Sequence, residues 1–243
     1  MNEYIVFDIE TSSVNWDELS NSQQEYLIRR ADTPDEIEKT KFEMSLSPFT
    51  AQVVCIGLIF AQKNELGELE IKAKSSFSAS NSFGEDSPLE KTELADGTIN
   101  LTGSEKVILE KFWKTLEGHP RAILLSFNGR NFDCPFLMLR SALLRVKASR
   151  NLMQGTKFNY DKHIDLADQL TFFSGSFYGP TRRYNFDFYS QAFGIVSPKS
   201  AGVDGSMVPQ LFRDGKTDII AEYCMRDVVA TWELYLILRE YLM

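Results

Sequence analysis

The stretch Glu3–Ser13, EYIVFDIETSS, decides the fold and poses a physical problem. Residues 4–7 are apolar on both faces of an expected strand, which then runs into Asp8 and Glu10. Successive side chains of a strand alternate between its faces, so these two carboxylates lie side by side while Ile9 points the other way. Two like charges so close repel each other unless something positive lies between them. The strand therefore either ends in solvent here or contributes to a cation site.

Length and composition indicate an ordinary globular protein. The chain has 243 residues, of which 43% are hydrophobic, enough for an ample core. Its longest apolar stretch, VVCIGLIFA at Val53–Ala61, has the length of a strand rather than of a membrane span. The first residues lack a basic segment followed by an apolar run. We therefore expect a cytoplasmic protein with no export signal and no membrane partner.

The cysteines argue against a zinc site. Cys55, Cys134 and Cys224 lie far apart, each within an apolar segment, and none belongs to a Cys-x-x-Cys pair. Only two histidines are present to join them. This pattern favours buried thiols in a reducing compartment.

The charge of the chain is unevenly distributed. The formal net charge is -8, yet residues 140–216 contain 11 Lys or Arg against 6 Asp and no Glu, a balance of +5. The remaining residues contain 15 Lys or Arg against 28 Asp or Glu, a balance of -13. A basic third on an acidic chain suits a surface that faces phosphates, although a solvated face is the more common meaning of such an imbalance.

Hydrophobic periodicity predicts strands first and then strands that alternate with helices. Further strands are expected at residues 53–61, 68–77, 121–128 and 163–168. Helices are expected from a capping box of Thr102 and Glu105 to Gly118, and at residues 131–148, 185–193, 206–212 and 217–241. This order indicates one α/β domain over residues 1–243, with a mixed β-sheet flanked by helices. Two insertions interrupt it, a charged helical segment at about 12–52 and a mobile loop at about 78–101.

Two further segments carry acids at the ends of expected elements. In SFNGRNFDCPFL a strand ends at Asn128 and Asp133 begins an apolar helix, where an acid also favours the helix dipole. In EYCMRDVVATWELY, Tyr223 and Asp227 are four residues apart and share one face of a helix. Asp227 has apolar neighbours, so we expect it to be half-buried and to need a partner.

Together, Asp8, Glu10, Asp133 and Asp227 answer the question raised by the first strand. Clustered carboxylates are the ligands that Mg²⁺ and Mn²⁺ prefer in proteins. A pair of such ions activates a water molecule and stabilises the leaving oxygen when a phosphodiester is hydrolysed.

The three segments resemble the exonuclease motifs of the DEDD superfamily, whose members are DnaQ-like and have the ribonuclease H-like fold. FDIET resembles the first motif, NGRNFD the second and YCMRD the third, in the expected order. The tyrosine of the third segment marks the DEDDy branch, and the second segment is closest to the exonuclease domain of family B DNA polymerases. The resemblance extends from Ile5 to about Tyr235, outside the two insertions.

This resemblance implies a role for each motif residue. Asp8 would bridge two metal ions, Glu10 and Asp227 would bind the ion that activates the water, and Asp133 would hold the second ion. Tyr223 would orient the attacking water. Asn128, which precedes Asp133 by five residues, would support the second motif or the substrate end.

Other residues are candidates for binding substrate. Thr11 lies beside Glu10, and Lys199 precedes the last helix, where several members of the superfamily carry a lysine that contacts the scissile phosphate. The alternative for Lys199 is an ordinary exposed lysine. Phe173 and Phe177 belong to a segment of aromatics, glycines and arginines that suits base stacking, although such aromatics are more often core residues.

His163 and Asp165 are expected to have structural roles. His163 lies 64 residues before Asp227, too far upstream to replace Tyr223 as the histidine of the sister branch. Asp165 either touches the site or caps a turn, and we favour the cap.

The sequence therefore predicts a stand-alone 3′-5′ exonuclease that uses two Mg²⁺ or Mn²⁺ ions on single-stranded nucleic acid. The second motif favours DNA over RNA. An exoribonuclease is the first alternative, because the superfamily also trims RNA. A catalytically silent nucleic-acid-binding module is the second, although all four acids are present. No segment identifies a protein partner.

Overall fold

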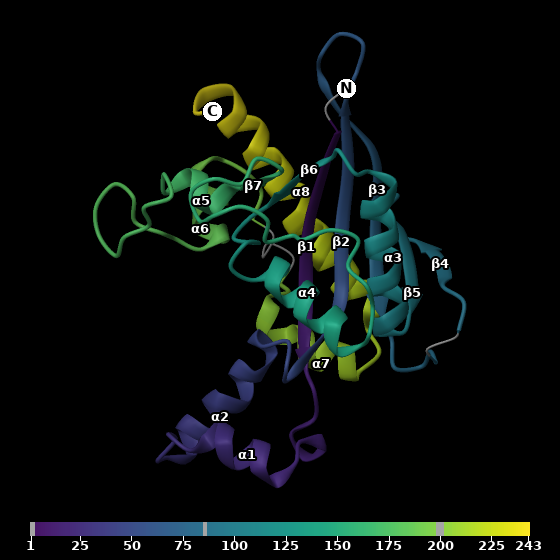
Figure 1. The fold of residues 1–243 in the computed structure, drawn as a ribbon, viewed down its shortest axis with the longest axis vertical. Helices are drawn as coiled ribbons and strands as arrows, with labels where there is room; N and C mark the ends of the chain where they lie inside the picture. Colours follow the sequence, from purple (N-terminus) through teal and green to yellow (C-terminus); the bar gives the residue numbers. More distant parts are fainter. Residues whose placement is uncertain (1–2, 85–86, 198–201) are drawn as a thin grey trace.

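The structure is a computed structural model that describes residues 3–84, 87–197 and 202–243 (Figure 1). Its centre is a seven-stranded mixed sheet with the strand order β4-β5-β3-β2-β1-β6-β7. The strands are β1 (Glu3–Ser13), β2 (Ala51–Lys63), β3 (Leu69–Ala79), β4 (Glu90–Glu93), β5 (Ile99–Gly103), β6 (Ile123–Ser126) and β7 (His163–Asp165). The helices are α1 (Asn21–Ile28), α2 (Pro34–Glu43), α3 (Glu105–Gly118), α4 (Asp133–Leu143), α5 (Leu166–Leu170), α6 (Phe186–Ala192), α7 (Val208–Arg213) and α8 (Thr217–Tyr241), with the 3-10 turns η1 (Trp16–Glu18), η2 (Met44–Leu46) and η4 (Gly205–Met207).

β1 is a central strand that is covered on both faces. It pairs antiparallel with β2 and parallel with β6. Ile5 and Ile9 belong to one core cluster, whereas Tyr4 and Val6 belong to another. α3 and α4 cover one face of the sheet and α8 crosses the other (Figure 1). The predicted alternation of β1 side chains is therefore confirmed.

Aromatic contacts hold α8 against the sheet. The ring centroids of Trp232 and Tyr235 lie 6.4 and 5.5 Å from that of Tyr4 in β1. α8 spans the residues that the sequence predicts for it, so this prediction is confirmed. Within the part of the chain that the structure describes, no helix has the length and apolar composition needed to cross a membrane.

The charged segment between β1 and β2 is helical, as its sequence predicts. α1 begins with a capping box of Ser20 and Gln23, and α2 with one of Thr33 and Glu36. Neither helix contains a buried residue, and the segment projects from one end of the sheet (Figure 1). It is slightly shorter than predicted because β1 and β2 continue into it.

The prediction of a loop at residues 78–101 is wrong for part of this segment, which contains β4 and most of β5. Asn100 of β5 is fully buried, and its side-chain oxygen accepts hydrogen bonds from Ser76 and Ser78 of β3 at 3.0 and 2.8 Å. Because this contact between strands is polar, a search for alternating apolar residues does not detect it. β4 is an exposed edge strand, where charged residues are usual.

Two predicted helix bounds also need correction. α4 ends at Leu143 rather than at residue 148, because Arg145 has a φ of +60°, a left-handed conformation that ends helices. α3 is capped by Ser104, whose side chain accepts a hydrogen bond from the N–H of Val107. Thr102 belongs to β5 and does not cap the helix. The expected strand at residues 163–168 is confirmed only for β7, because its second half belongs to α5. The other predicted elements are present, most of them within a few residues of the expected bounds.

Candidate active site

Asp8 and Glu10 lie on the face of β1 that α8 crosses. In the register with β2, Asp8 lies opposite Gly57 and Glu10 opposite Cys55. Both acids line a cavity of about 290 Å³, which we call the carboxylate cavity. Its lining is Asp8, Glu10, Phe127, Asn185, Phe186, Asp187, Tyr223 and Asp227. The first and third motifs therefore meet in one cavity.

Asp133 lies beside the part of β1 that no longer pairs with β6. The pairing of β1 with β6 stops before the acidic end of β1, so the N–H of Ile9 needs another acceptor. It donates to Asp133 Oδ1 at 3.0 Å. Asp133 is buried and is the first residue of α4. This bond fixes the second motif beside the backbone between Asp8 and Glu10, although Asp133 does not itself line the carboxylate cavity.

The turn before α4 is held by Asp165. Its carboxylate accepts the backbone N–H groups of Asn128 and Arg130 at 2.8 and 2.9 Å, and it caps α5. Asn128 has a φ of +62°, and a Cβ at Gly129 would lie 2.2 Å from the hydroxyl of Ser126. The turn therefore requires a glycine at residue 129. The expected structural role of Asp165 is confirmed.

His163 is also structural. Its Nε2 lies 2.7 Å from Ser126 Oγ and its Nδ1 lies 3.8 Å from Cys134 Sγ. Burial lowers the pKa of His163 to about 3, so the ring is neutral at physiological pH. The expectation that His163 does not serve as the active-site histidine of the sister branch agrees with this position.

The close approach of α8 to the sheet depends on Gly57. A Cβ at this residue would lie 2.8 Å from Val228 Cγ2 and 2.9 Å from Cys224 Sγ, both on α8. Such distances are too short for real contacts, so α8 would have to shift. Glycine therefore allows α8 to bring Tyr223 and Asp227 to the carboxylate cavity.

We expect Gly57→Ala to lower the turnover of a single-stranded oligonucleotide by about 10²-fold, since a displacement of about 1 Å at catalytic groups has that effect. The added methyl group should also lower the free energy of unfolding by about 1 to 3 kcal/mol. Gly118→Ala is the matched control, because a Cβ there meets nothing within 4 Å. A wild-type rate in folded Gly57→Ala protein would contradict this role.

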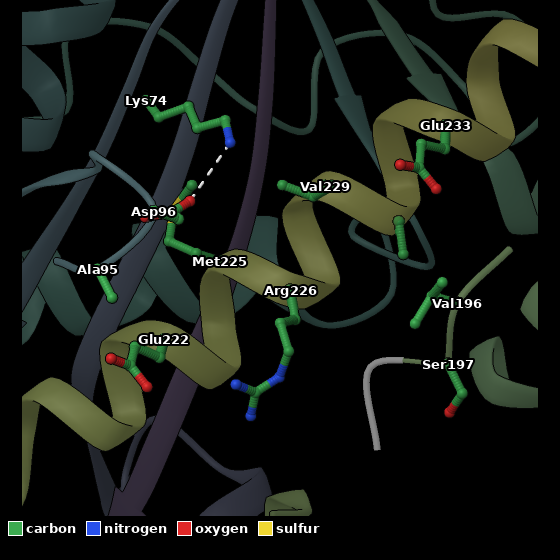
Figure 2. Close-up of a pocket in the computed structure, with 11 residues that line it drawn as sticks. Lys74, Ala95, Asp96, Val196, Ser197, Glu222, Met225, Arg226, Val229 and Glu233 are labelled. Atoms are coloured by element: carbon green, nitrogen blue, oxygen red, sulfur yellow. Dashed lines mark hydrogen bonds and ion pairs between the residues drawn. The ribbon is translucent and has the colours of Figure 1, made fainter. Parts of the chain in front are cut away.

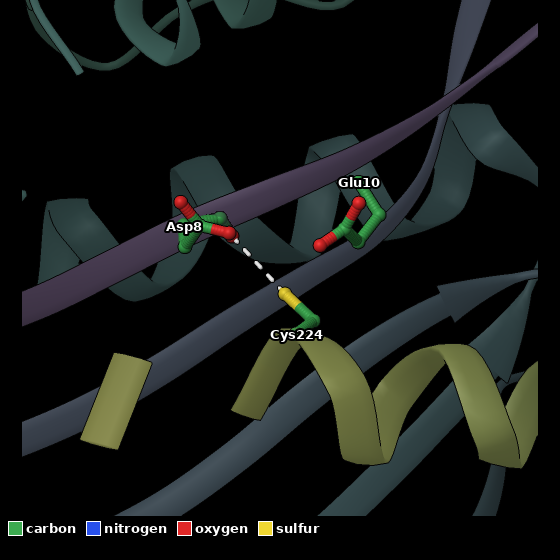
Figure 3. Close-up of side chains that lie close together, drawn as sticks. All are labelled: Asp8, Glu10 and Cys224. Carbon is green, nitrogen blue, oxygen red and sulfur yellow. Dashed lines mark hydrogen bonds between the residues drawn. The ribbon is translucent and has the colours of Figure 1, made fainter. Parts of the chain in front are cut away.

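Cys224 lies beside the acids of β1 (Figure 3). Its Sγ and one carboxylate oxygen each of Asp8 and Glu10 lie within 4.8 Å of one another. The thiol donates to the backbone carbonyl of Asp8 at 3.5 Å. Burial raises the pKa of the thiol, which keeps it protonated and disfavours a role as nucleophile or metal ligand. The expectation of buried thiols is confirmed for all three cysteines.

The site acids have strongly perturbed pKa values. Burial, followed by the negative charges of the neighbouring acids, raises the pKa of Asp8 and of Glu10 well above the usual range. Burial is also the main cause that raises the pKa of Asp133 to about 7, and Asp227 contributes to the rise. The charges of all four acids therefore interact with one another. The described lining of the carboxylate cavity includes no lysine, arginine or histidine.

These observations fit a site for divalent cations. The donor set consists of carboxylates, which hard cations prefer. A bound cation would favour the charged form of each acid and so remove the repulsion that raises its pKa. Gathering four mutually repelling acids, of which Glu10 and Asp133 are buried and Asp8 and Asp227 half-buried, has no evident structural purpose. Such clusters are common at functional sites.

In a chelator, we expect Asp133→Asn to gain stability relative to the wild type as the pH rises from about 4 to about 7. The pKa of Asp133 is about 7 in the folded protein and about 4 in an unfolded chain. The folded wild type therefore binds the proton more tightly, and its free energy of unfolding falls through this window as that proton is lost. Urea unfolding of both proteins at each pH measures the difference. A difference that does not change with pH would contradict the prediction.

Tyr223 is buried next to Asp227, and its hydroxyl is hydrogen-bonded to the carboxylate of that residue. Burial raises the pKa of Tyr223, and the charges of Asp227, Glu10 and Asp8 raise it further. The hydroxyl therefore stays protonated. It can position a polar group in the carboxylate cavity but cannot act there as a base.

Phe173 and Phe177 line a separate hollow of about 340 Å³, which we call the aromatic hollow. Arg182, Arg183 and Lys157 line it as well. Phe177 is 89% exposed, so it is not a core residue. The aromatic hollow shares no lining residue with the carboxylate cavity.

Asn128 lies next to the aromatic hollow. Its side-chain oxygen accepts a hydrogen bond from Arg183 Nη2 at 2.5 Å, and Arg183 lines the hollow. Thr11 lines neither the carboxylate cavity nor the aromatic hollow, and its hydroxyl donates to the carbonyl of Ser45 at 2.7 Å. The prediction for Lys199 lies outside the described residues.

Sequence reasoning missed four residues of the cavity lining. These are Phe127, Asn185, Phe186 and Asp187. Asn185 caps α6, and Asp187 lies in the first turn of that helix. Only the start of α6 can be recognised from the sequence. Nothing in the residues of α6 indicates that this helix lies beside the first and third motifs.

Another hollow, of about 400 Å³, lies against a different part of α8 (Figure 2). Met225 and Val229 contribute to its wall, and Lys74 and Asp96, which form an ion pair at 3.3 Å, lie across from them. It contains none of the four motif acids. It is therefore not part of the candidate active site.

The chain is similar to one protein of known sequence and to one solved structure in particular. An uncharacterized protein of Methanocaldococcus jannaschii is 31% identical over 147 residues, which cover 58% of this chain and 77% of that protein. A solved family B DNA polymerase from the hyperthermophilic archaeon Pyrobaculum calidifontis matches with a TM-score of 0.57 and 15% identity. The match covers 98% of this chain and 25% of the polymerase chain, so this chain spans about a quarter of the polymerase's length. The expected ribonuclease H-like fold is confirmed.

The family match supplies the identity of the chain. Residues 84–242 match the family described as predicted 3′-5′ exonucleases related to the exonuclease domain of PolB. The matched range includes Asp133, Tyr223 and Asp227 and begins after Asp8 and Glu10. Because it covers more than half of the chain, this protein belongs to that family of predicted 3′-5′ exonucleases.

Proposed function

We propose that this protein is a 3′-5′ exonuclease of the DEDDy type, in which residues 1–243 form a single domain that acts on single-stranded DNA ends. The observation that carries the proposal is the carboxylate cavity, where Asp8, Glu10 and Asp227 meet beside Tyr223. The family match supports the class of reaction. The similarity of the second motif to family B polymerases favours DNA over RNA.

In this proposal, Asp8, Glu10, Asp133 and Asp227 would hold two Mg²⁺ or Mn²⁺ ions. Asp8, Glu10 and Asp227 would supply ligands from the carboxylate cavity, where the water is activated, and Asp133 would supply a ligand from the start of α4. When bound, such ions supply a water molecule of lowered pKa and stabilise charge on the leaving oxygen. The hydrogen bond from Ile9 keeps the Asp133 carboxylate beside β1, so part of the site is preorganised by the backbone.

Tyr223 would orient the attacking water. Its hydroxyl is protonated because burial raises its pKa, and it lies in the same cavity as Asp8, Glu10 and Asp227. A fixed hydroxyl there restricts the water to a productive direction of attack, which is a catalytic contribution of position rather than of proton transfer.

We expect Tyr223→Phe to lower the catalytic rate by about 10²-fold with little change in substrate binding, because only the positioning hydroxyl is lost. Single-turnover rates and binding constants measured on the same oligonucleotide separate the two effects. Tyr235→Phe is the matched control, since Tyr235 is also buried in α8 but lies outside the carboxylate cavity. An unchanged rate in Tyr223→Phe would mean that the tyrosine only packs.

The single strand would extend from the carboxylate cavity past Asn128 to the aromatic hollow. Arg183 contacts Asn128 and lines the hollow, and Phe127, which precedes Asn128 in the chain, lines the carboxylate cavity. Phe173 and Phe177 would stack on bases, which contributes about 1 to 3 kcal/mol for each base. Lys157 and the arginines of the hollow would face phosphates. On the resemblance alone, we also assign Lys199 to the scissile phosphate.

The test is digestion of matched 5′-labelled DNA and RNA oligonucleotides by the isolated 243-residue chain with Mg²⁺ or Mn²⁺. The expected result is a ladder of DNA products shortened from the 3′ end. Faster digestion of RNA would identify an exoribonuclease. Binding of either strand without cleavage under all metal conditions would identify a silent nucleic-acid-binding module instead.

A further inference from the structure

A second cavity, of about 410 Å³, lies between the strands β6 and β7 and the segment that follows α4. We call it the basic cavity because Arg130, Arg150 and Lys162 line it. It shares no lining residue with the carboxylate cavity or the aromatic hollow. Its volume is in the range of small-molecule sites, and it is larger than a single ion requires.

Arg150 lines the basic cavity and has two buried donors without a partner among the described residues. Its Nη1 donates to the carbonyl of Ala122 at 3.2 Å. Its Nε and Nη2 are buried and have no hydrogen-bond partner among the residues that the structure describes. These two nitrogens form one edge of the guanidinium, the fork that binds two oxygens of a phosphate or carboxylate at once. Buried donors without partners are rare in native proteins, so a ligand is a physical explanation for them.

Arg130 brings a second guanidinium to the basic cavity. It is buried, lies 3.9 Å from the ring centroid of Tyr160, and donates to the carbonyls of Gln154 and Leu152 at 3.2 and 3.5 Å. Among the ion pairs of residues 3–84, 87–197 and 202–243, none involves Arg130 or Arg150. Both guanidiniums therefore lie beside the same cavity without a carboxylate at ion-pair distance among the described residues.

The charge of the lining selects the ligand. Arg130, Arg150 and Lys162 contribute three positive charges and Asp161 one negative charge, a formal sum of +2. His163 adds none, because burial lowers its pKa to about 3, and the two guanidiniums lower it further. A sum of +2 complements the dianion of a phosphate group better than the single charge of a carboxylate.

We propose that the basic cavity binds a doubly charged phosphate group, whose charge Arg130, Arg150 and Lys162 in its lining neutralise. A nucleoside monophosphate and free phosphate both carry this group. The cavity volume favours the nucleoside monophosphate, and the amide side chains of Asn151 and Asn159 in the lining suit the polar edge of a base. This ligand site is separate from the carboxylate cavity and does not depend on the proposed catalytic mechanism.

The test is isothermal titration of the full chain with dAMP, deoxyadenosine and inorganic phosphate, in excess chelator. Without divalent cations, the four acids repel phosphate from the carboxylate cavity, so failure of the proposed nuclease function does not affect the result. We expect one dAMP to bind per chain and deoxyadenosine to bind at least about tenfold more weakly. Binding of inorganic phosphate as tight as that of dAMP would support the site and identify free phosphate as its ligand.

Variants locate the bound phosphate. Arg150→Gln should weaken the binding of dAMP by at least about tenfold. Lys162→Gln should weaken the binding of dAMP severalfold. Because Lys162 is exposed, this substitution should not affect folding, so the variant still tests the proposal if Arg150→Gln does not fold. Arg145→Gln, which changes an exposed arginine outside the basic cavity, and Asp227→Asn should bind as the wild type does.

Three results would overturn the proposal. The first is equal binding of dAMP and deoxyadenosine, which would remove the role of the phosphate. The second is wild-type affinity in folded Arg150→Gln protein, or in Lys162→Gln if the former does not fold. The third is loss of dAMP binding in Asp227→Asn, which would place the ligand in the carboxylate cavity.

Discussion

In Asp8→Asn protein, nuclease activity is expected to fall by about 10³-fold or more, while the metal-free protein becomes more stable at neutral pH. Asp8 interacts with all the other site acids, because its pKa is raised first by burial and then by the charges of Asp133, Asp227 and Glu10. Metal-assisted stabilisation of transition-state charge contributes several kcal/mol, and each 1.4 kcal/mol changes a rate about tenfold. Removing one charge from a buried acidic cluster relieves repulsion, as expected where a site is organised for function rather than for stability.

The asparagine is chosen because it keeps the shape of Asp8. The backbone carbonyl that accepts the Cys224 thiol is unaffected, so the packing of α8 should remain. Rates with saturating Mg²⁺ or Mn²⁺ and urea unfolding in chelator are the two measurements. Asp17→Asn, at an exposed acid of η1, is the control for charge removal and should change neither. Wild-type activity in excess chelator would rule out the metal mechanism, whatever the variant does.

The parts of the site that could be predicted are those set by local geometry. Asp8 and Glu10 face one cavity because a strand has a period of two residues, and the strand could be recognised from its apolar first half. Tyr223 and Asp227 share a helix face because they are four residues apart. Asp133 was less certain, since an acid at a helix start has a structural explanation of its own. Its contact with Ile9 joins residues that are 124 positions apart.

The features that could not be predicted depend on contacts between distant segments. Gly57 lies in an apolar strand like many others, and only the structure shows that α8 passes within 2.8 Å of a Cβ placed there. Asn100 resembles a loop residue until its partners on β3 are known. Arg150 resembles a surface arginine, yet two of its donors are buried without a partner within the described part of the chain. Single-sequence patterns report periodicity and not the neighbours of each position.

A covalently closed single-stranded DNA circle is expected to resist this enzyme completely, while the linear strand of the same sequence is degraded. Hydrolysis by metal ions is in principle possible at any phosphodiester, so a requirement for an end must come from the shape of the site. The carboxylate cavity has about 290 Å³, and Phe127, Asn185 and Phe186 are part of its lining. This volume is near the lower limit of small-molecule sites and suits one terminal nucleotide rather than a continuous strand.

The same reasoning predicts the order of rates on linear substrates. The last base of a duplex has to unstack before it can enter the carboxylate cavity, which costs about 1 to 2 kcal/mol for each base-pair step. Blunt duplex should therefore be digested about tenfold more slowly than single strands for each step that must open. The readout is a ladder of 5′-labelled products, with Asp8→Asn protein as the control for contaminating nuclease. Linearisation of circles by the wild type, but not by Asp8→Asn, would show that the same acids cleave internal bonds and that an exonuclease is the wrong assignment.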